Sequence, residues 1–382
     1  MEGTLGLLTA LKWSTWLGSS WRFLFPVAVV VALRVVYAEI LYRFLNPAVS
    51  IHSVVKGWLY LFTAWDSEHY ITIARSWYPH VISPEWGFFP LYPALLRVLS
   101  LVGLDVPVTA LVLALSFGFV SIVIFQKIAE FYLTRKEAFQ ATLLYFLLPP
   151  VFVFCGVSYA EPLFLALSML CWYCHIYRKD VWSCVAAALA SLVRPYGILL
   201  IVPLGIHYVF RRQWRNLAYS LIAPLTVAGW MIYSFLMTGT FAYLASLETY
   251  WQAEYSARIE LAVQESLRGH VNVALGNLLV YAYAHVPVLI AGLVALSVIA
   301  VLSFRTLNLD TALGWYSVLS VFTIFLFGLP KAFVSFPRYL GFIFPIGLVL
   351  YGLKAKAAFA CLVILAVLDY LAWYAFLTDS FF

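Results

Sequence analysis

Several residues that could do chemistry stand together in the string Trp65-Asp66-Ser67-Glu68-His69-Tyr70. The Asp66 carboxylate could act as a general base toward a hydroxyl group, and Glu68 and His69 would add two polar groups within one helical turn. Asp is also a preferred residue at helix N-termini, where its side chain accepts backbone N–H groups. The string therefore predicts either an acid/base site or a helix cap, and composition alone leaves both interpretations open.

The same string has a spacing that would suit a metal ion, because Mn, Mg and Zn bind carboxylate oxygens and imidazole nitrogens. No second His-rich motif accompanies it, and residues three positions apart, such as Asp66 and His69, share a face of any helix. A divalent cation is thus compatible with the string, but the sequence firmly implies no metal or other cofactor.

Glu161, Arg194 and Arg338 each stand next to a proline where a hydrophobic run begins or ends. Glu161 could be the acidic residue of a helix start, or it could be a second carboxylate facing Asp66. The two arginines could be snorkelling side chains. Alternatively they could clamp a phosphate, since a guanidinium binds phosphate bidentately and stays charged in a poor dielectric. Two such arginines with acids nearby suggest an anionic lipid headgroup as ligand.

Cys171-Trp172-Tyr173-Cys174-His175 has the C-x-x-C-H spacing of haem attachment. We interpret these cysteines instead as buried thiols, because the string lies in an apolar run that ends at the basic pair Arg178 and Lys179. The sequence also lacks G-x-x-x-x-G-K-[ST] and G-x-G-x-x-G. It therefore gives no support to a nucleotide-driven pump or a dinucleotide enzyme.

The elements that must position these residues are membrane helices. Of the 382 residues, 64% are hydrophobic and 10% charged, whereas a soluble domain carries roughly 25% charged residues. This composition excludes a water-soluble fold, and the net charge of +6 is too dilute for a nucleic-acid partner.

The sequence predicts an all-α polytopic membrane protein with about eleven spans of about 20 residues each, placed near 23–44, 107–126, 138–157, 162–177, 181–193, 196–210, 217–237, 277–304, 312–329, 338–353 and 357–377. We expect the first twenty residues to form an interfacial helix before a signal anchor.

The sidedness of the loops depends on residues 88–104, an apolar segment with two prolines and a central Arg97. A central arginine costs about 2.5–3.5 kcal/mol on insertion scales, so we expect this segment to lie in the interface, within an outer loop over 45–106. The basic connectors then all face the cytoplasm, as the positive-inside rule requires; they contain Lys127, Arg135, Lys136, Arg178, Lys179, Arg211, Arg212, Arg215, Arg305, Lys354 and Lys356. The candidate site residues gather on the opposite, outer face, together with a second outer loop at 238–276.

Five motifs follow one another along the chain: Trp65 to Tyr70, then Phe88-Phe89-Pro90-Leu91-Tyr92-Pro93, Ser158-Tyr159-Ala160-Glu161, Ser191-Leu192-Val193-Arg194-Pro195 and Pro337-Arg338-Tyr339. In this order they resemble the PIG-V-like mannosyltransferases, relatives of GPI mannosyltransferase 2 in the GT-C superfamily of polytopic glycosyltransferases. The combination of Trp-Asp with Phe-Phe-Pro is specific, whereas each motif alone is much less so. Outside these motifs the chain is similar to the family in hydropathy only.

The resemblance implies a single GT-C-like domain over residues 1–382 that transfers mannose, or a similar hexose, with inversion. The implied donor is a polyprenyl-phosphate-linked sugar, and the implied acceptor is a glycolipid on the outer or lumenal face. Asp66 matches the position of the family's base, and Glu68, His69, Glu161, Arg194 and Arg338 are the expected substrate-binding residues. The chain is short beside eukaryotic members, which favours a prokaryotic cell membrane over the endoplasmic reticulum and puts a GPI precursor as acceptor in doubt.

A secondary transporter of a small polar or anionic solute is the main alternative, because carboxylates and broken helices also mark transport sites near the bilayer midplane. The notable charges lie instead at the outer ends of spans, and no internal repeat is evident. A membrane-embedded interaction subunit without catalytic activity is a third hypothesis.

Overall fold

We describe a computed structural model of the chain for residues 21–45, 62–63, 65–252, 297–328 and 336–377. These residues form helices and connecting turns without a β-strand, so the all-α prediction is confirmed for this part of the chain. The expected N-terminal interfacial helix lies outside the described residues, as do residues 46–61 of the first outer loop. Most of the second outer loop and of the span expected at 277–304 also lie outside them.

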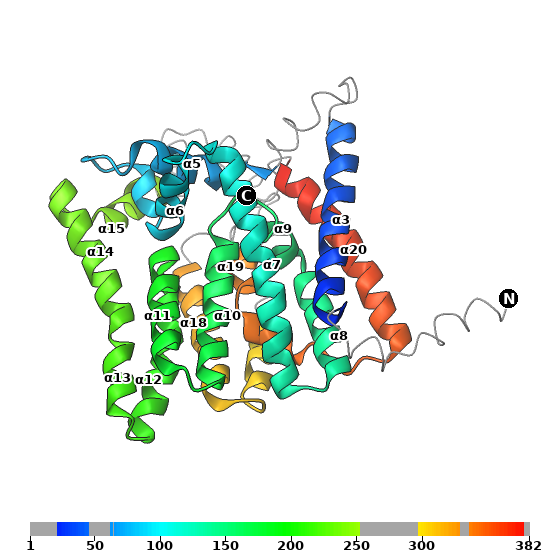
Figure 1. The fold of residues 1–382 in the computed structure, drawn as a ribbon. Helices are drawn as coiled ribbons and strands as arrows, with labels where there is room; N and C mark the ends of the chain where they lie inside the picture. The colour runs from blue at the N-terminus through cyan, green and yellow to red at the C-terminus, as the bar shows by residue number, and fades with distance from the viewer. Residues whose placement is uncertain (1–20, 46–61, 64, 253–296, 329–335, 378–382) are drawn as a thin grey trace, which may run out of the picture.

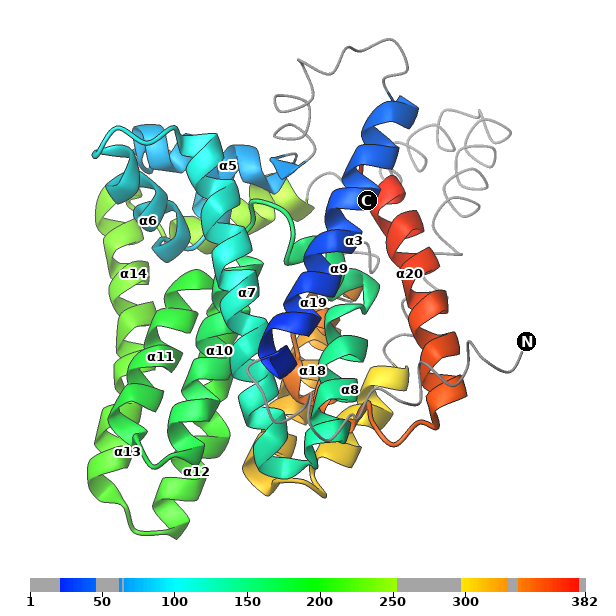
Figure 2. The ribbon, with the colours of Figure 1, turned by 45° about the vertical axis from the view of Figure 1, so that its right-hand side comes forward.

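The helices form an upright bundle with smaller helices lying across one end (Figure 1). Figure 2 shows α3 and α20 side by side at one edge of the bundle, and α5 and α6 near the upper ends of α7 and α14. The main helices are α3 (Trp21–Leu45), α5 (Asp66–Ser76), α6 (Leu91–Ser100), α7 (Val106–Tyr132), α8 (Arg135–Phe146), α9 (Pro149–Phe154), α10 (Glu161–Ile176), α11 (Asp180–Val193), α12 (Ile201–Phe210), α13 (Trp214–Ser220), α14 (Ile222–Thr238), α15 (Ala242–Ser246), α18 (Thr311–Gly328), α19 (Phe336–Gly341) and α20 (Ala355–Leu377). Short 3-10 helices cover Pro84–Gly87, Pro195–Leu200 and Phe344–Val349, and a π-helical turn covers Leu247–Gln252.

Three helical stretches of the described chain are long and apolar enough to cross a membrane: Phe23–Ile40, Val106–Tyr132 and Trp214–Thr238. Shorter apolar helices run beside them, so the expected set of about eleven spans is not seen as eleven long helices. The span expected at 138–157 is divided between α8 and α9, because Leu148 precedes a proline and adopts an extended conformation. The span expected at 338–353 is likewise divided between α19 and the 3-10 helix Phe344–Val349, which has a proline in its first turn.

The helix α6 lies within the segment expected in the interface, and its central Arg97 has a structural partner. The Arg97 guanidinium donates hydrogen bonds to the carbonyl oxygens of Ala74 and Arg75, both at 3.0 Å. These carbonyls belong to the last turn of α5, where a helix leaves its C=O groups without N–H partners. Arg97 therefore ties α6 to the end of α5.

A second arginine, Arg34, lies near the middle of α3 with only 5% of its surface exposed. Its Nε and Nη2 atoms donate to the Phe152 carbonyl oxygen at 3.1 and 2.8 Å, in the last turn of α9. The fully buried Asp369 of α20 lies within electrostatic range of this guanidinium. The sequence analysis had treated both residues as parts of apolar spans, so their burial within electrostatic range of each other is a finding of the structure.

Candidate active site

Asp66 is the first residue of α5, and Trp65 occupies the N-cap position before it. The Oδ2 atom of Asp66 forms an ion pair with Nη1 of Arg338 at 2.7 Å. The backbone N–H of Asp66 donates to the hydroxyl oxygen of Tyr159 at 3.2 Å, which gives this end of α5 a partner outside the helix. Helix capping therefore does not explain the Asp66 side chain.

Arg338 of α19 is 3% exposed, and it joins two carboxylates that are far apart in the sequence. Besides its contact with Asp66, its Nε donates a short hydrogen bond to Oε1 of Glu161, and its Nη2 lies within ion-pair distance of the same oxygen. The guanidinium also lies 4.6 Å from the ring centroid of Tyr159 and 5.0 Å from that of Phe154. A buried charge requires such compensation, because an isolated one is very costly in a poor dielectric.

Glu161 stands at the start of α10 and is 3% exposed. Its Oε1 atom also accepts a hydrogen bond from Nη2 of Arg194 at 2.5 Å, so a single carboxylate oxygen holds two guanidinium groups. Ala160 occupies the N-cap position of α10, and the second carboxylate oxygen of Glu161, Oε2, has no hydrogen-bond partner among the described residues. Glu161 is thus the centre of a buried network, and the interpretation as a helix-start acid does not account for it.

The network is neutral overall, because two carboxylates face two guanidiniums. A cavity of about 30 Å³ adjoins it, lined in part by Glu161, Arg194, Tyr196 and Tyr339. Room for a water molecule needs only about 10–15 Å³, so the cavity can hydrate the inner edge of the network. The arrangement offers a carboxylate at the start of a partly buried helix and, beside it, two cations that an anion could engage, the buried Arg338 and the partly buried Arg194.

His69 and Glu68 occupy different surroundings from these four residues. Nδ1 of His69 faces Oε1 of Glu85 at 3.6 Å, and its ring stacks on Phe88 with the centroids 4.9 Å apart. Partial burial of Glu85 opposes the ionisation of its carboxyl group. Hydrogen bonds to this group and the nearby His69 outweigh that effect and lower the pKa of Glu85 below its usual value. The Glu68 side chain is exposed. The structure therefore brings together four of the six predicted site residues and gives Glu85 a role beside His69 that the sequence analysis had not assigned.

The Phe-Phe-Pro motif supports α5 through aromatic contacts. Tyr70 meets Phe88 edge to face at 4.9 Å, and it meets Tyr92 at 5.0 Å with an angle of 90° between the rings. Tyr70 and Tyr92 are both buried. The two motifs that were most specific in the sequence thus pack directly on each other.

The five cysteines are free thiols, and Cys171 and Cys174 of the C-x-x-C-H string are buried as expected. Among the described residues, His, Cys, Asp and Glu form no group of three or more that could hold a metal ion. The string at 66–69 thus does not bring such a ligand set together within this part of the chain.

The sequence model of a family described as Mannosyltransferase (PIG-V) matches residues 23–250. The chain belongs to the PIG-V mannosyltransferase family. No curated protein and no solved structure is significantly similar to it. The matched range contains Asp66, Glu161 and Arg194, whereas Arg338 lies beyond it and enters the site through its contacts alone.

As a member of the PIG-V mannosyltransferases, the chain is a membrane glycosyltransferase that takes a sugar donor and a glycolipid acceptor. The resemblance found in the motifs is thereby confirmed, and the transporter hypothesis is not favoured. The apolar helices agree with a membrane protein.

Proposed function

We propose that this PIG-V family enzyme transfers mannose, or a similar hexose, from a polyprenyl-phosphate donor to a glycolipid acceptor. The observation that carries the proposal is the network in which Asp66 and Glu161 meet Arg194 and Arg338. A lipid-phosphate sugar needs a cation for the departing phosphate and a base for the acceptor hydroxyl, and the guanidiniums and carboxylates of this network have the chemistry for these two roles.

We place the reaction on the outer or lumenal face of a GT-C-like domain that extends over residues 1–382. In this arrangement about eleven segments span the bilayer, and the outer loops at 45–106 and 238–276 cover the site. A multi-pass protein of a prokaryotic cell membrane fits the chain best. The proposal rests on the basic connectors between spans, which favour the cytoplasmic side.

In the proposed reaction, Asp66 removes the proton from the acceptor hydroxyl while the acceptor oxygen bonds to the anomeric carbon of the donor sugar. The bond between this carbon and the phosphate oxygen breaks, and its electron pair leaves with the phosphate. A single displacement of this kind inverts the anomeric centre and requires neither a second carboxylate nor a covalent intermediate.

Arg338 and Arg194 are the proposed phosphate ligands. The negative charge on the phosphate increases as the bond to the sugar breaks, and fixed cations stabilise such a developing charge most strongly. Nη1 of Arg338 is held by Asp66 in this structure, so an arriving phosphate would compete with Asp66 for it. Donor binding would then release the Asp66 carboxylate for the acceptor, which predicts that the donor binds before proton transfer begins.

The Asp66→Asn substitution tests the assignment of the base. An amide cannot take up the proton, so we expect transfer to fall by about 10²–10⁴-fold, the usual contribution of a general base. Asp105→Asn is a matched control, because Asp105 caps α7 through the Val108 N–H at 3.1 Å and Asn caps equally well. Purified, folded Asp66→Asn protein that transfers sugar at nearly the wild-type rate would refute the role of Asp66.

A further inference from the structure

The end of the bundle away from α5 contains two turns of the same construction, between α10 and α11 and between α12 and α13. In the first, the Lys179 N–H donates to the Cys174 carbonyl at 2.8 Å and the Arg178 N–H donates to the His175 carbonyl at 3.0 Å. The second repeats the pattern, with N–H groups of residues 213 and 212 donating to carbonyls of residues 208 and 209 at 2.8 and 3.0 Å. Each turn thus closes its helix with the pair of bonds typical of a glycine-terminated helix.

Arginine occupies the position where such turns normally have glycine. The φ angle is 60° at Arg178 and 53° at Arg212, in the left-handed region that a residue with a Cβ atom adopts only at a cost. Strained backbone of this kind persists where the surrounding structure enforces it and where the side chain serves a purpose. Arginine in place of the usual glycine in two neighbouring turns indicates that both arginine side chains are needed there.

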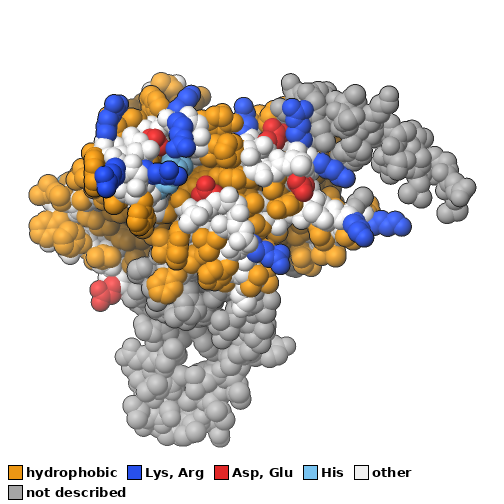
Figure 3. All heavy atoms as spheres, turned by 90° about the horizontal axis from the view of Figure 1, so that it is seen from below, with side chains coloured by type: hydrophobic (Ala, Val, Ile, Leu, Met, Phe, Trp, Pro, Cys, Tyr) orange, Lys and Arg blue, Asp and Glu red, His pale blue; other side chains and the backbone are white. Residues whose placement is uncertain are grey.

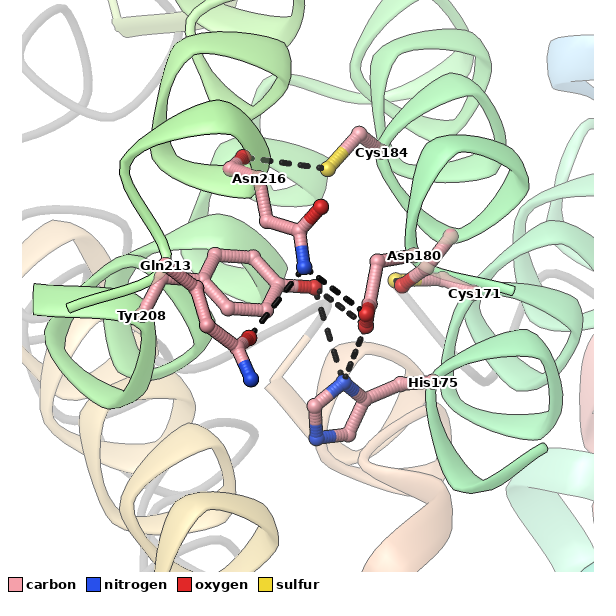
Figure 4. Close-up of polar contacts among 8 residues, drawn as sticks. Cys171, His175, Asp180, Cys184, Tyr208, Gln213 and Asn216 are labelled. Atoms are coloured by element: carbon pink, nitrogen blue, oxygen red, sulfur yellow. Dashed lines mark hydrogen bonds and ion pairs between the residues drawn. The ribbon is translucent and has the colours of Figure 1, made fainter. Parts of the chain in front are cut away.

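A polar cluster holds the two turns together (Figure 4). Asp180, at the start of α11, accepts hydrogen bonds from the Tyr208 hydroxyl and from Nδ2 of Asn216, both at 2.9 Å, and it faces Nδ1 of His175 at 3.0 Å. Tyr208 and Asn216 belong to the helices on either side of the second turn, whereas His175 and Asp180 belong to the helices on either side of the first. The cluster therefore fixes the distance between the two turns, and the carboxylate of Asp180 is bound by residues of the cluster itself.

The side chains outside this cluster are basic and aromatic. We call the exposed residues Arg178, Lys179, Arg211, Arg212 and Arg215 the basic double turn. Figure 3 shows Lys and Arg side chains gathered on this face around a His side chain. Exposed aromatic residues flank the double turn, with 51% of Tyr177, 65% of Trp182, 83% of Phe210 and 62% of Trp214 accessible. Exposed Trp and Tyr residues gather at the depth of lipid headgroups, so this surface lies where phosphate groups are concentrated.

We infer that the basic double turn binds the phosphate of an anionic phospholipid in the leaflet on this side of the membrane. Arg178 and Arg211, one from each turn, both lie within electrostatic range of His207, as does the carboxylate of Asp310. A general preference for positive charge in cytoplasmic loops does not explain the geometry, because that preference is satisfied by basic residues anywhere in a short loop. Neither the left-handed arginines nor the cluster that joins the turns would be required for it.

The test compares the thermal midpoint of the purified full-length protein in vesicles of phosphatidylcholine with that in vesicles containing phosphatidylglycerol. We expect phosphatidylglycerol to raise the midpoint of the wild type by several degrees, because a ligand that binds only the folded state stabilises it. The increase should shrink at high ionic strength, as surface charge interactions are screened by salt. This measurement does not depend on sugar transfer, so its outcome is separate from that of the proposed function.

The decisive variant is Arg178→Gly with Arg212→Gly. Glycine suits the left-handed turns, so the midpoint in phosphatidylcholine should stay the same or rise, while most of the shift from phosphatidylglycerol should disappear. The matched control, Arg135→Gln with Lys136→Gln, removes the same charge from another exposed basic connector and should keep the shift. Tyr208→Phe, which removes the contacts of the hydroxyl with Asp180 and His175, should reduce the shift.

Three results would overturn the inference. The first is a glycine variant that keeps the full lipid shift, and the second is a control variant that loses as much of it. The third is an equal rise of the wild type in phosphatidylcholine with inorganic phosphate added, because the site would then recognise free phosphate and not a lipid. If the glycine variant does not fold, Arg178→Asn with Arg212→Asn replaces it, since Asn tolerates the left-handed region.

Discussion

Arg338 is the residue on which the candidate site depends most, because its guanidinium faces both Asp66 and Glu161. A single charged residue of such a buried network cannot be replaced without affecting its partners. Loss of a single member leaves its partner charged and without compensation, which is costlier than the pair itself. The side-chain geometry matters as much as the charge, since a guanidinium can face two acceptors at once whereas an ammonium is a point charge.

Substituting lysine for the two arginines separates charge from geometry. Arg338→Lys and Arg194→Lys keep the positive charge but lose the planar fork, so we expect transfer to fall by about tenfold or more, equivalent to about 1.4 kcal/mol of barrier. The loss should come with weaker donor binding, measured as a higher KM for the lipid-phosphate sugar. Arg75→Lys, an exposed position of α5, is the control. Wild-type donor affinity and turnover in both variants would exclude the phosphate clamp.

Removing the charge of Glu161 should affect stability even without substrate. In Glu161→Gln the two guanidiniums of Arg194 and Arg338 lose the carboxylate between them, so we expect a loss of about 3–5 kcal/mol in the free energy of unfolding. Glu137→Gln is the matched control, because Glu137 belongs to a capping box at α8 in which Gln also functions. Equal midpoints in thermal unfolding for both variants would show that the Glu161 contacts contribute little.

The sequence indicated Glu161, Arg194 and Arg338 because a charge beside a proline at the end of an apolar run has few structural explanations, and it indicated Asp66 through the string at residues 65–70. It could not assign their partners. Asp66 and Arg338 are separated by most of the chain, and their contact depends on how α5, α10 and α19 pack. His69 illustrates the same limit, because the motif predicted substrate binding but did not reveal that the ring stacks on Phe88.

At the scale of elements, α9 shows how a short helix can be held inside the bundle. Its last turn offers the Phe152 carbonyl oxygen, and the buried Arg34 of α3 supplies the donors. The chain then continues through Tyr159 to Glu161, so the position of this turn bears on the position of the site. We regard Arg34 as a positioning residue for this segment.

A double-mutant cycle tests this role. Arg34→Met removes the donors to Phe152 and leaves the buried Asp369 without a nearby cation, so we expect a destabilisation of about 3–5 kcal/mol. Adding Asp369→Leu should recover part of the loss but not the charged hydrogen bonds, worth about 1.5–3 kcal/mol. Purely additive changes in the free energy of unfolding would mean that the two residues do not interact.

Hydropathy predicted where helices lie but not where they break. The division between α8 and α9 follows from the conformation of a residue that precedes proline, a local effect that a count of apolar residues does not include. Arg34 was missed for a similar reason, since one charge hardly changes the average over a long apolar run. A charge at the centre of a predicted span was the signal that could have revealed it.

For the whole molecule, the sidedness of the connectors can be tested by chemical labelling. Single cysteines at Ser83 or Asp105, with Cys361 replaced, should react with an impermeant thiol reagent from outside intact cells, because both positions belong to the proposed outer loop. A cysteine at Glu137 should react only after the membrane is opened. Labelling of the Asp105 position from the cytoplasmic side alone would mean that residues 88–104 span the bilayer and that the candidate residues do not share one face.

The unequal lengths of the central helices have a consequence for the membrane itself. At about 1.5 Å per residue, the 16 residues of α10 and the 14 of α11 reach only about 21–24 Å, whereas the 27 residues of α7 reach about 40 Å. Figure 1 shows the upper end of α11 well below that of α7, and Glu161 and Arg194 stand at the ends of α10 and α11. A bilayer becomes locally thinner beside helices that are shorter than its hydrocarbon core. The bilayer surface should therefore dip toward the site, so that a lipid-borne phosphate reaches the arginines without its chain being drawn out of the hydrocarbon.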